Sequence, residues 1–326
     1  MKRHGNLFDR IVDTQNITLA AHKARRGKST RNNVRKFFKN QDTCVEKIRS
    51  SLIYKTFTTS GYQTKTIYEP KIRTIYILPF NPDRIVQHAL MSVIEPIWDN
   101  LLISDSYACR TGKGIHAGSK RTSGFVRQYD YCLKCDVAKF YQSVNHDILF
   151  DIVKQKIKCR DTLWLIENII YSYPGDTNIP IGNYTSQWFG NLYLNELDVL
   201  VKHQFKIKAY LRYCDDFCLF HNDKRLLNSL AAGIKAFVAD RLNLTLSKCD
   251  VFPVKHGVDF LGYRHFRNKI LLRKSTAKRV VKKVKQLPCK LITGQITDDQ
   301  FISSLASISG WIKWANTHNF RQSLPC

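Results

Sequence analysis

The feature of the sequence that most constrains its fold is a pair of adjacent acids between two short apolar runs. Residues 209–221, AYLRYCDDFCLFH, carry Asp215 and Asp216 near their centre. Apolar β-type runs that meet at two such residues predict a tight hairpin. A third acid, Asp136, closes another strand-like run at residues 130–136. The pattern therefore predicts short strands that carry acids at their ends.

Acids inside apolar runs need a partner, because adjacent carboxylates repel each other. One interpretation is a solvated turn, in which Asp-Asp pairs are common. The other is a divalent cation that neutralises the carboxylates. Mg²⁺ suits two or three carboxylates, since it keeps water ligands and shares its shell with phosphate. The acids by themselves leave the solvated turn open; if a cation is bound, two Mg²⁺ ions, with Mn²⁺ as a substitute, are the expected cofactors.

The net charge indicates a polyanionic partner. The chain has 52 Lys and Arg against 26 Asp and Glu, a formal charge of +26. Such an excess favours nucleic acid over an anionic membrane surface. Residues 23–39 hold eight Lys or Arg and no acid, which is typical of a solvated tail or of an arm that contacts phosphates. With no membrane-spanning run and no secretory signal, we expect a cytoplasmic protein without a membrane partner.

Hydrophobic periodicity outlines the remaining elements. Alternation predicts a hairpin over residues 65–80 around Pro70 and a strand pair over 250–266. Helical spacing of apolar residues predicts helices over 83–98, 186–202 and 229–242. It also predicts one helix that begins after an N-cap at Asn145 and another that runs from Phe301 to Ile312. A further basic helix is expected to begin at a Ser275 cap and to end at Pro288.

Five segments in register resemble the motifs of reverse transcriptases. Residues 133–141 (LKCDVAKFY) resemble the first palm motif, and Tyr213-Cys-Asp-Asp216 resembles the YxDD box. Residues 179–187 (IPIGNYTSQ) are similar to the nucleotide-pocket motif, and residues 260–263 (FLGY) to the primer-grip hairpin. Residues 107–118 (YACRTGKGIHAG) resemble the fingers segment of bacterial members. The order and spacing hold over about residues 65–320.

The resemblance implies an α+β, right-hand polymerase fold. It places a basic N-terminal segment at 1–40, fingers and palm at 41–265 with an antiparallel palm sheet backed by helices, and a small basic helical thumb at 266–326. It also implies templated addition of dNMP to a 3′-hydroxyl. Asp136 and Asp215 would be metal ligands together with the carbonyl of Val137, and Asp216 would be the supporting third acid.

The resemblance assigns further residues by position. Tyr141 would crowd a ribose 2′-hydroxyl and so favour dNTPs, while Arg73 and Lys71 would reach the triphosphate. The nucleotide-binding residues implied are Lys71, Arg73, Tyr141, Ile181, Gly182 and Gln187. The primer grip would be Phe260, Leu261, Gly262 and Tyr263. The nucleic-acid-binding residues implied are Arg110, Lys113, Lys278, Arg279, Lys282 and Lys283.

The subtype is also indicated. The form Ile181-Gly-x-x-x-Ser186-Gln187 is typical of reverse transcriptases from diversity-generating retroelements, and residues 272–275 and 311–318 resemble that group. It implies a bacterial or phage source, a dedicated template RNA, a cDNA primer and product, a small basic oligomeric accessory protein, and errors at template adenines. An Ile at 181 cannot hydrogen-bond near the nascent base pair, so we expect it to lower fidelity.

Three alternatives remain open from the sequence. The first is a reverse transcriptase of the retron or group II intron type. The second is a polymerase-like RNA-binding protein without activity, which the complete set of acids disfavours. The third is an RNA-directed RNA polymerase, which Tyr141 and the YxDD box disfavour.

Overall fold

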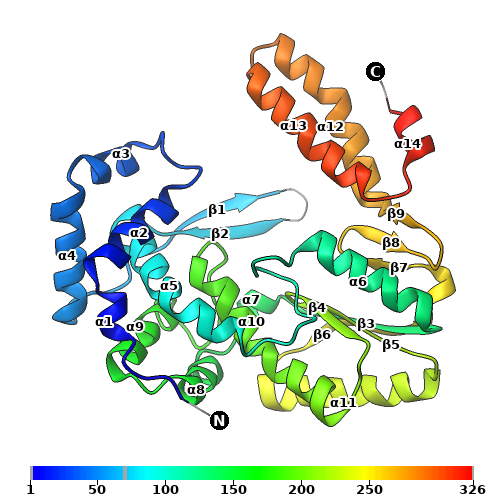
Figure 1. Ribbon diagram of the computed structural model, residues 1–326, viewed down its shortest axis with the longest axis horizontal. Coiled ribbons are helices and arrows are strands. Elements are labelled where there is room, and N and C mark those ends of the chain that lie inside the picture. Colours follow the sequence, from blue (N-terminus) through cyan, green and yellow to red (C-terminus); the bar gives the residue numbers. More distant parts are fainter. Residues whose placement is uncertain (1–2, 69–71, 325–326) are drawn as a thin grey trace. The chain divides into compact units, whose positions relative to one another are not determined.

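The computed structural model describes residues 3–68 and 72–324 and combines helices with antiparallel sheets, as expected (Figure 1). Its contacts divide the chain into two compact units. The first unit comprises Met1–Ser104, Val137–Phe205 and Ile234–Ser247. The second comprises Asp105–Asp136, Lys206–Gly233 and Lys248–Cys326. Each unit is therefore assembled from three separate segments of the chain.

The first unit is mainly helical. The apolar helix α5 (Ile85–Asp99) packs along α2 (Thr14–Arg25), and the side-chain amide of Asn16 donates to the carbonyl of Ala89 at 3.1 Å. Its other helical elements are α1 (Phe8–Ile11), α3 (Asn32–Lys39), α4 (Gln41–Ile53), η1 (Phe80–Arg84), α7 (Phe140–Ser143), α8 (His146–Lys156), α9 (Arg160–Ile170), α10 (Tyr184–Val199) and η2 (Leu200–Gln204). Helix α11 (Lys224–Leu242) begins in the second unit and ends in the first.

The basic stretch 23–39 is folded rather than a solvated tail. It ends α2 and forms α3. The rings of Phe37 and Phe38 lie 5.5 and 6.3 Å from that of Phe80 on η1, and the Arg25 guanidinium lies 4.6 Å from the Phe38 ring. Aromatic burial therefore holds this stretch in place while its charged ends reach solvent.

Two local predictions for the first unit are confirmed. Strands β1 (Gln63–Ile67) and β2 (Arg73–Ile77) pair antiparallel, as alternation predicted, and residues 69–71 between them lie outside the described residues. The side chain of Asn145 accepts a hydrogen bond from the Ile148 amide at 3.0 Å and caps α8.

The second unit contains a four-stranded sheet in the order β4-β5-β3-β6. Its strands are β3 (Tyr131–Val137), β4 (Tyr210–Tyr213), β5 (Asp216–His221) and β6 (Leu246–Pro253). Strand β5 pairs antiparallel with both β3 and β4. Helix α6 (Ile115–Gln128) covers one face, where Phe125 and Val126 pack with Cys132, Cys218 and Phe220. Because side chains alternate along β3, Lys134 and Asp136 share this face with Cys132.

A smaller antiparallel sheet and a helical hairpin complete the second unit. The sheet consists of β7 (Val258–Phe260), β8 (Tyr263–His265) and β9 (Ile270–Leu272) and follows the short helix η3 (Val254–His256). Helices α12 (Lys274–Ile292) and α13 (Asp298–Lys313) enclose their own apolar core, and α14 (His318–Gln322) follows.

Two predictions about α12 are wrong. The helix begins at Lys274, with Arg273 at the N-cap position and no side-chain cap, so Ser275 does not start it. It also continues past Pro288 to Ile292. Proline removes a helical hydrogen bond, but Leu287 packs with Ile308 and Ile312 of α13. Tertiary packing therefore keeps this segment helical beyond the proline.

Candidate active site

The adjacent acids lie at the turn of the β4–β5 hairpin. Tyr213 pairs with Asp216, so Cys214 and Asp215 form the two-residue connection. Cys214 has a φ of 53°, the left-handed conformation that such tight turns use and that is uncommon for a residue with a side chain. The predicted hairpin is confirmed, with Asp216 as the first residue of β5.

The third acid lies directly opposite on the neighbouring strand. Asp136 on β3 pairs with Asp216 on β5, and side chains at such positions are direct neighbours on one face of a sheet. Asp136 and Asp215 both raise the pKa of Asp216 electrostatically. The structure therefore brings together the three acids that the sequence singled out.

The surroundings of the Asp216 carboxyl raise its pKa above the ordinary value for aspartate. Burial, as the largest cause, raises its pKa to about 6, and the Lys134 ammonium 3.4 Å from Oδ2 acts in the opposite direction. The second oxygen, Oδ1, is buried and has no hydrogen-bond partner among the residues that the structure describes. Because a buried acceptor without a partner is costly, this oxygen fits an additional ligand.

These donors fit a hard cation that takes part of its shell from other molecules. Across residues 3–68 and 72–324, no three His, Cys, Asp or Glu side chains form a ready-made metal site. Mg²⁺ does not require one, because it is commonly held by one or two carboxylates together with waters and substrate phosphates. The clustered carboxylates and the buried Oδ1 of Asp216 meet that requirement.

The residues predicted to bind nucleotide lie in the first unit, apart from Lys71, which lies outside the described residues. Gly182 has a φ of 125°, and a Cβ there would lie 2.2 Å from the carbonyl oxygen of Tyr76 on β2. The Tyr76 amide donates to the carbonyl of Ile181 at 2.7 Å. The motif segment 179–187 is therefore fastened to the strand that begins at Arg73.

Tyr141 anchors the same segment from the other side. Its carbonyl accepts a hydrogen bond from the Ile179 amide at 2.8 Å. A Cβ at Gly190 of α10 would lie 3.8 Å from the Tyr141 ring, which is ordinary contact. Gln187 and Arg73 are exposed. A backbone hydrogen bond thus joins the first palm motif to the nucleotide-pocket motif.

The predicted primer-grip residues form the tight turn between β7 and β8. Phe260 pairs with Tyr263, and both Leu261 and Gly262 have positive φ values, 56° and 86°. This is the pattern of a type I′ hairpin turn, whose strands keep the twist of the sheet. A Cβ at Gly262 would lie 2.8 Å from the Trp311 ring, so α13 closely covers the turn.

An aromatic cluster links this turn to α6 and α13. Tyr263 stacks on Trp311 with ring centroids 5.3 Å apart, and its hydroxyl lies 3.2 Å from Nε2 of His116. His116 stacks on Trp314 at 4.7 Å, and Nε1 of Trp314 donates to the hydroxyl of Ser119 at 2.7 Å. The sequence motif at 311–318 therefore has a structural role in holding the β7–β8 turn.

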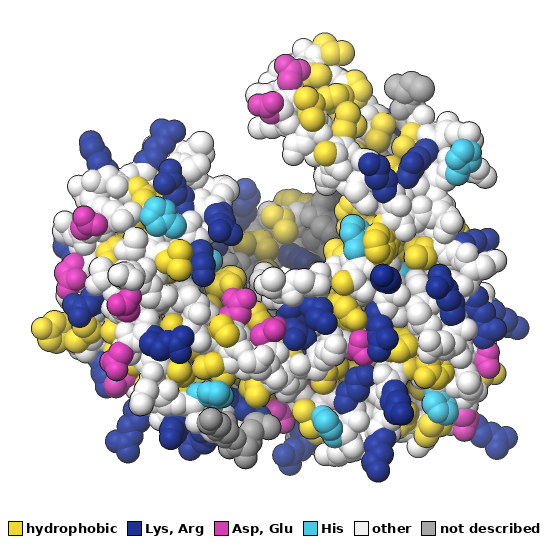
Figure 2. Space-filling model, viewed as in Figure 1, with side chains coloured by type: hydrophobic (Ala, Val, Ile, Leu, Met, Phe, Trp, Pro, Cys, Tyr) yellow, Lys and Arg dark blue, Asp and Glu magenta, His cyan; other side chains and the backbone are white. Residues whose placement is uncertain are grey.

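The basic residues expected to bind nucleic acid fall into two groups within the second unit. Arg110 donates to the Ser106 carbonyl at 3.1 Å, and the Lys113 ammonium lies 5.3 Å from the Tyr107 ring, both just before α6. The other four are exposed along α12: Lys278, Arg279, Lys282 and Lys283. Lys and Arg side chains are spread over the face shown in Figure 2, where acids are few.

A further cationic group lies in the first unit and consists of Lys28 and Arg31, from the basic stretch 23–39, together with Arg84, which the sequence did not single out. Burial is the largest cause of a lowered pKa at both Lys28 and Arg84, and nearby Arg31 lowers both further. The Nε of Arg84 is buried without a hydrogen-bond partner. None of the three pairs with an acid in the described part of the chain. Uncompensated cations of this kind fit a phosphate group.

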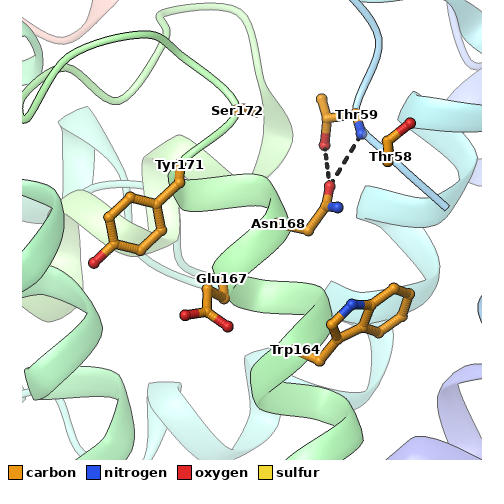
Figure 3. Close-up of a pocket in the computed structure, with 7 residues that line it drawn as sticks. All are labelled: Thr58, Thr59, Trp164, Glu167, Asn168, Tyr171 and Ser172. Carbon is orange, nitrogen blue, oxygen red and sulfur yellow. Dashed lines mark hydrogen bonds between the residues drawn. The ribbon is translucent and has the colours of Figure 1, made fainter. Parts of the chain in front are cut away.

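A pocket of about 540 Å³ also lies in the first unit, between α9 and the residues that precede β1 (Figure 3). Its lining residues are Thr58, Thr59, Trp164, Glu167, Asn168, Tyr171 and Ser172. Asn168 Oδ1 accepts hydrogen bonds from the Thr59 amide at 3.0 Å and from the Thr59 hydroxyl at 2.9 Å. No residue predicted to act in catalysis or binding lines this pocket.

Within the described ranges, no helix has both the length and the apolar character needed to cross a membrane.

Lys134 is the residue near the acids that sequence reasoning did not assign. A charged residue inside the apolar run 131–135 was the signal that could have found it.

Several known proteins are similar in sequence to this chain. The chain is 23% identical over 256 residues to Protein YkfC of Escherichia coli K12, covering 63% of this chain and 67% of that protein. It is 24% identical over 192 residues to the group II intron-encoded protein LtrA of Lactococcus lactis, covering 51% and 32% of the two chains. It is 20% identical over 252 residues to the putative COX1/OXI3 intron 2 protein of Saccharomyces cerevisiae, covering 56% and 29%.

The chain thus spans about two thirds of YkfC but under a third of the two intron-encoded relatives. The family model described as reverse transcriptase (RNA-dependent DNA polymerase) matches residues 64–265, which include the three acids and the β7–β8 turn. Since this match covers more than half of its length, the chain belongs to the reverse transcriptase family.

Proposed function

We propose that this protein is an RNA-directed DNA polymerase that copies a dedicated template RNA into cDNA, with errors concentrated at template adenines. The observation that carries the proposal is the geometry of the acids. Asp136 lies opposite Asp216, and Asp215 occupies the adjoining turn. Membership in the reverse transcriptase family supports the same reaction.

In this proposal Asp136 and Asp215, with the carbonyl of Val137, would hold two Mg²⁺ ions, or Mn²⁺ in their place. Bound there, the ions would activate the primer 3′-hydroxyl and neutralise charge on the triphosphate. Asp216 supports the two ligands as the third acid, and its own negative charge is offset by Lys134. Positioning and electrostatic stabilisation would supply most of the rate enhancement.

The remaining residues bind and orient the substrates. Arg73 and Lys71 would pair with the triphosphate, and Tyr141 would exclude the ribose 2′-hydroxyl. Ile181, Gly182 and Gln187 would line the nucleotide pocket. The turn Phe260–Tyr263 would hold the primer end. Arg110, Lys113 and the exposed cations of α12 would contact nucleic-acid phosphates, as cationic side chains do without regard to sequence.

The diversity-generating subtype rests on the Ile181-to-Gln187 form of the pocket motif and on residues 311–318. Under this proposal the partners are template RNA, the cDNA primer and product, dNTPs, and a small basic oligomeric accessory protein. A second candidate, a group II intron-type reverse transcriptase, is favoured by the similarity to the group II intron-encoded protein of Lactococcus lactis.

Primer extension on an RNA template with Mg²⁺ tests the proposal. We expect extension with dNTPs and not with NTPs, and a loss of at least about 10²-fold in rate for Asp215→Asn. The matched control is Asp240→Asn, which removes the charge of an exposed Asp on α11. RNA binding by Asp215→Asn should equal that of the wild type, since phosphate contacts are unaffected.

The outcomes separate the candidates. Errors concentrated opposite template adenine in the sequenced products support the diversity-generating subtype. Accurate copying supports the group II intron or retron type. RNA binding without any extension, in the presence and absence of candidate accessory proteins, contradicts the polymerase proposal and favours a non-catalytic RNA-binding protein.

A further inference from the structure

Lys134 is a buried charge in the middle of β3. Its residue exposure is 8%, although lysine is rarely buried without a partner. Its ammonium lies 3.4 Å from Oδ2 of Asp216 and donates a hydrogen bond to the backbone carbonyl of Asp259 on β7. It also lies 5.6 Å from the centroid of the Phe260 ring. One side chain thus contacts two other strands, β5 and β7.

The register explains how the ammonium reaches the acid. Lys134 pairs with Cys218, and Asp136 pairs with Asp216, so the ion pair runs diagonally across the two strands. Diagonal neighbours on one face of a sheet are within reach of a long side chain. Because Oδ2 of Asp216 faces the ammonium, Oδ1 is left as the buried oxygen without a hydrogen-bond partner.

The contacts continue beyond β7. The Asp259 carboxylate accepts a hydrogen bond from Nε of Arg273, the residue immediately before α12. The Arg273 amide in turn donates to the carbonyl of Gly262 in the β7–β8 turn at 3.0 Å. The contacts from Asp216 through Lys134 and Asp259 to Arg273 therefore connect the β4–β5 hairpin with the β7–β8 turn and the start of α12. The link between Lys134 and Asp259 is made by the backbone carbonyl of Asp259.

We infer that Lys134 is a positioning residue that orients the Asp216 carboxylate and holds the β7–β8 turn beside the β4–β5 hairpin. This inference rests on the proposed function, which assigns the β4–β5 hairpin to catalysis and the β7–β8 turn to the primer end. The ammonium compensates the mutual repulsion of Asp216, Asp136 and Asp215. It also keeps the primer end and the acids in one fixed arrangement.

Removing the Lys134 ammonium breaks its contacts with both Asp216 and Asp259. Without the ammonium, the Asp216 carboxylate loses its ion pair and keeps two acidic neighbours. The Asp259 carbonyl loses its bond to Lys134 of β3, which weakens the attachment of β7 to the larger sheet. Small displacements of reacting groups are costly because phosphoryl transfer depends on alignment.

The test compares Lys134→Met with Lys134→Arg. Met keeps most of the buried aliphatic volume and removes the charge, whereas Arg keeps the charge and the donors. Lys120→Met, at an exposed position on α6, is the matched control. We expect Lys134→Met to lower kcat in primer extension at least about tenfold and to raise the KM for primer, with the KM for dNTP within about twofold of wild type. Lys134→Arg should restore kcat to within about threefold.

Hydrogen exchange measured by mass spectrometry supplies a readout that does not depend on activity. In Lys134→Met, amides of residues 258–265 should exchange faster than in wild type, while those of α10 should be unchanged. If Lys134→Met does not fold, Lys134→Leu, which also removes both the charge and the hydrogen-bond donor, replaces it with the same expectations.

The inference is overturned if Lys134→Met keeps kcat within twofold of wild type, or if residues 258–265 exchange at the wild-type rate. Equal losses in Lys134→Arg and Lys134→Met also overturn it, because charge would then not be the cause. If the wild type does not extend primers at all, the proposed function fails, and the exchange measurement still decides whether Lys134 holds the turn.

Discussion

Replacing Gly182 with Ala should locally disrupt the first unit, because two separate features of the backbone require glycine there. Gly182 has a φ of 125°, in a region that residues with a Cβ rarely adopt. Its Cβ would also lie 2.2 Å from the carbonyl oxygen of Tyr76, whereas Cβ atoms essentially never come closer than 3.0 Å to another atom. The neighbour is backbone of β2, so no side chain can rotate away.

The magnitude can be worked from these contacts. Holding Ala at this φ costs about 1–3 kcal/mol. Relieving the overlap requires residues 181–182 and β2 to separate, which breaks the hydrogen bond from the Tyr76 amide to the Ile181 carbonyl. That loss adds about 1 kcal/mol. We therefore expect Gly182→Ala to lower the free energy of unfolding by about 3 kcal/mol, which corresponds to about 4 °C in Tm for a chain of 326 residues.

Thermal melting followed by circular dichroism measures the effect, and hydrogen exchange of residues 73–77 locates it. Two variants separate the causes. Gly175→Ala also has a positive φ, 94°, but no atom within 4 Å of the added Cβ, so it reports backbone strain alone. Gly124→Ala lies on α6 with open space and no positive φ, so it should stabilise by up to about 1 kcal/mol. A Gly182→Ala protein that melts within 2 °C of wild type, or no lower than Gly175→Ala, would refute the reasoning.

Two further predictions follow from other sites. Burial lowers the pKa of His265 to about 4, below the value of about 6.5 in the unfolded chain, so its contribution to stability is present above pH 6.5 and is lost as the pH falls to 4. His265→Gln removes the titrating group, so it should escape most of this loss, which is about 3 kcal/mol. An equal fall in Tm for the two proteins between pH 7 and pH 4 would contradict this prediction. Ile181→Gln should reduce misincorporation opposite template adenine about fivefold, since one added hydrogen bond contributes about 1 kcal/mol; an unchanged error spectrum in sequenced cDNA would count against this role of Ile181.

Much of the candidate site could be predicted because its signals are local. The β4–β5 hairpin follows from two apolar runs that meet at Cys214 and Asp215, and the strand that ends near Asp136 follows from alternation over seven residues. The Asn145 cap depends on a hydrogen bond to a residue only three positions away. Such features need no knowledge of the rest of the fold, because turn chemistry and side-chain period act within a few residues.

Other features could not be predicted because their partners are distant in sequence. The Lys134 ammonium bonds a carbonyl 125 residues away, and Trp314 bonds a serine 195 residues away. The end of α12 was misjudged at Pro288 because packing of Leu287 against α13 outweighs the lost backbone hydrogen bond. Likewise, the sequence predicted either a solvated tail or a phosphate-contacting arm over residues 23–39, and the packing of Phe37 and Phe38 against Phe80 could not be foreseen.

The amino-acid sequence by itself therefore determined which acids form the candidate site, which strands carry them and to which family the chain is related. Only the tertiary structure decided which oxygen of Asp216 faces the ammonium of Lys134, why position 182 tolerates no Cβ, and where the uncompensated cations around Arg84 lie. The physical reason is the distance along the sequence over which each kind of interaction acts. Local dihedral preferences and hydrophobic period are written in neighbouring residues, whereas burial, ion pairing and steric exclusion depend on atoms that only the complete fold brings together.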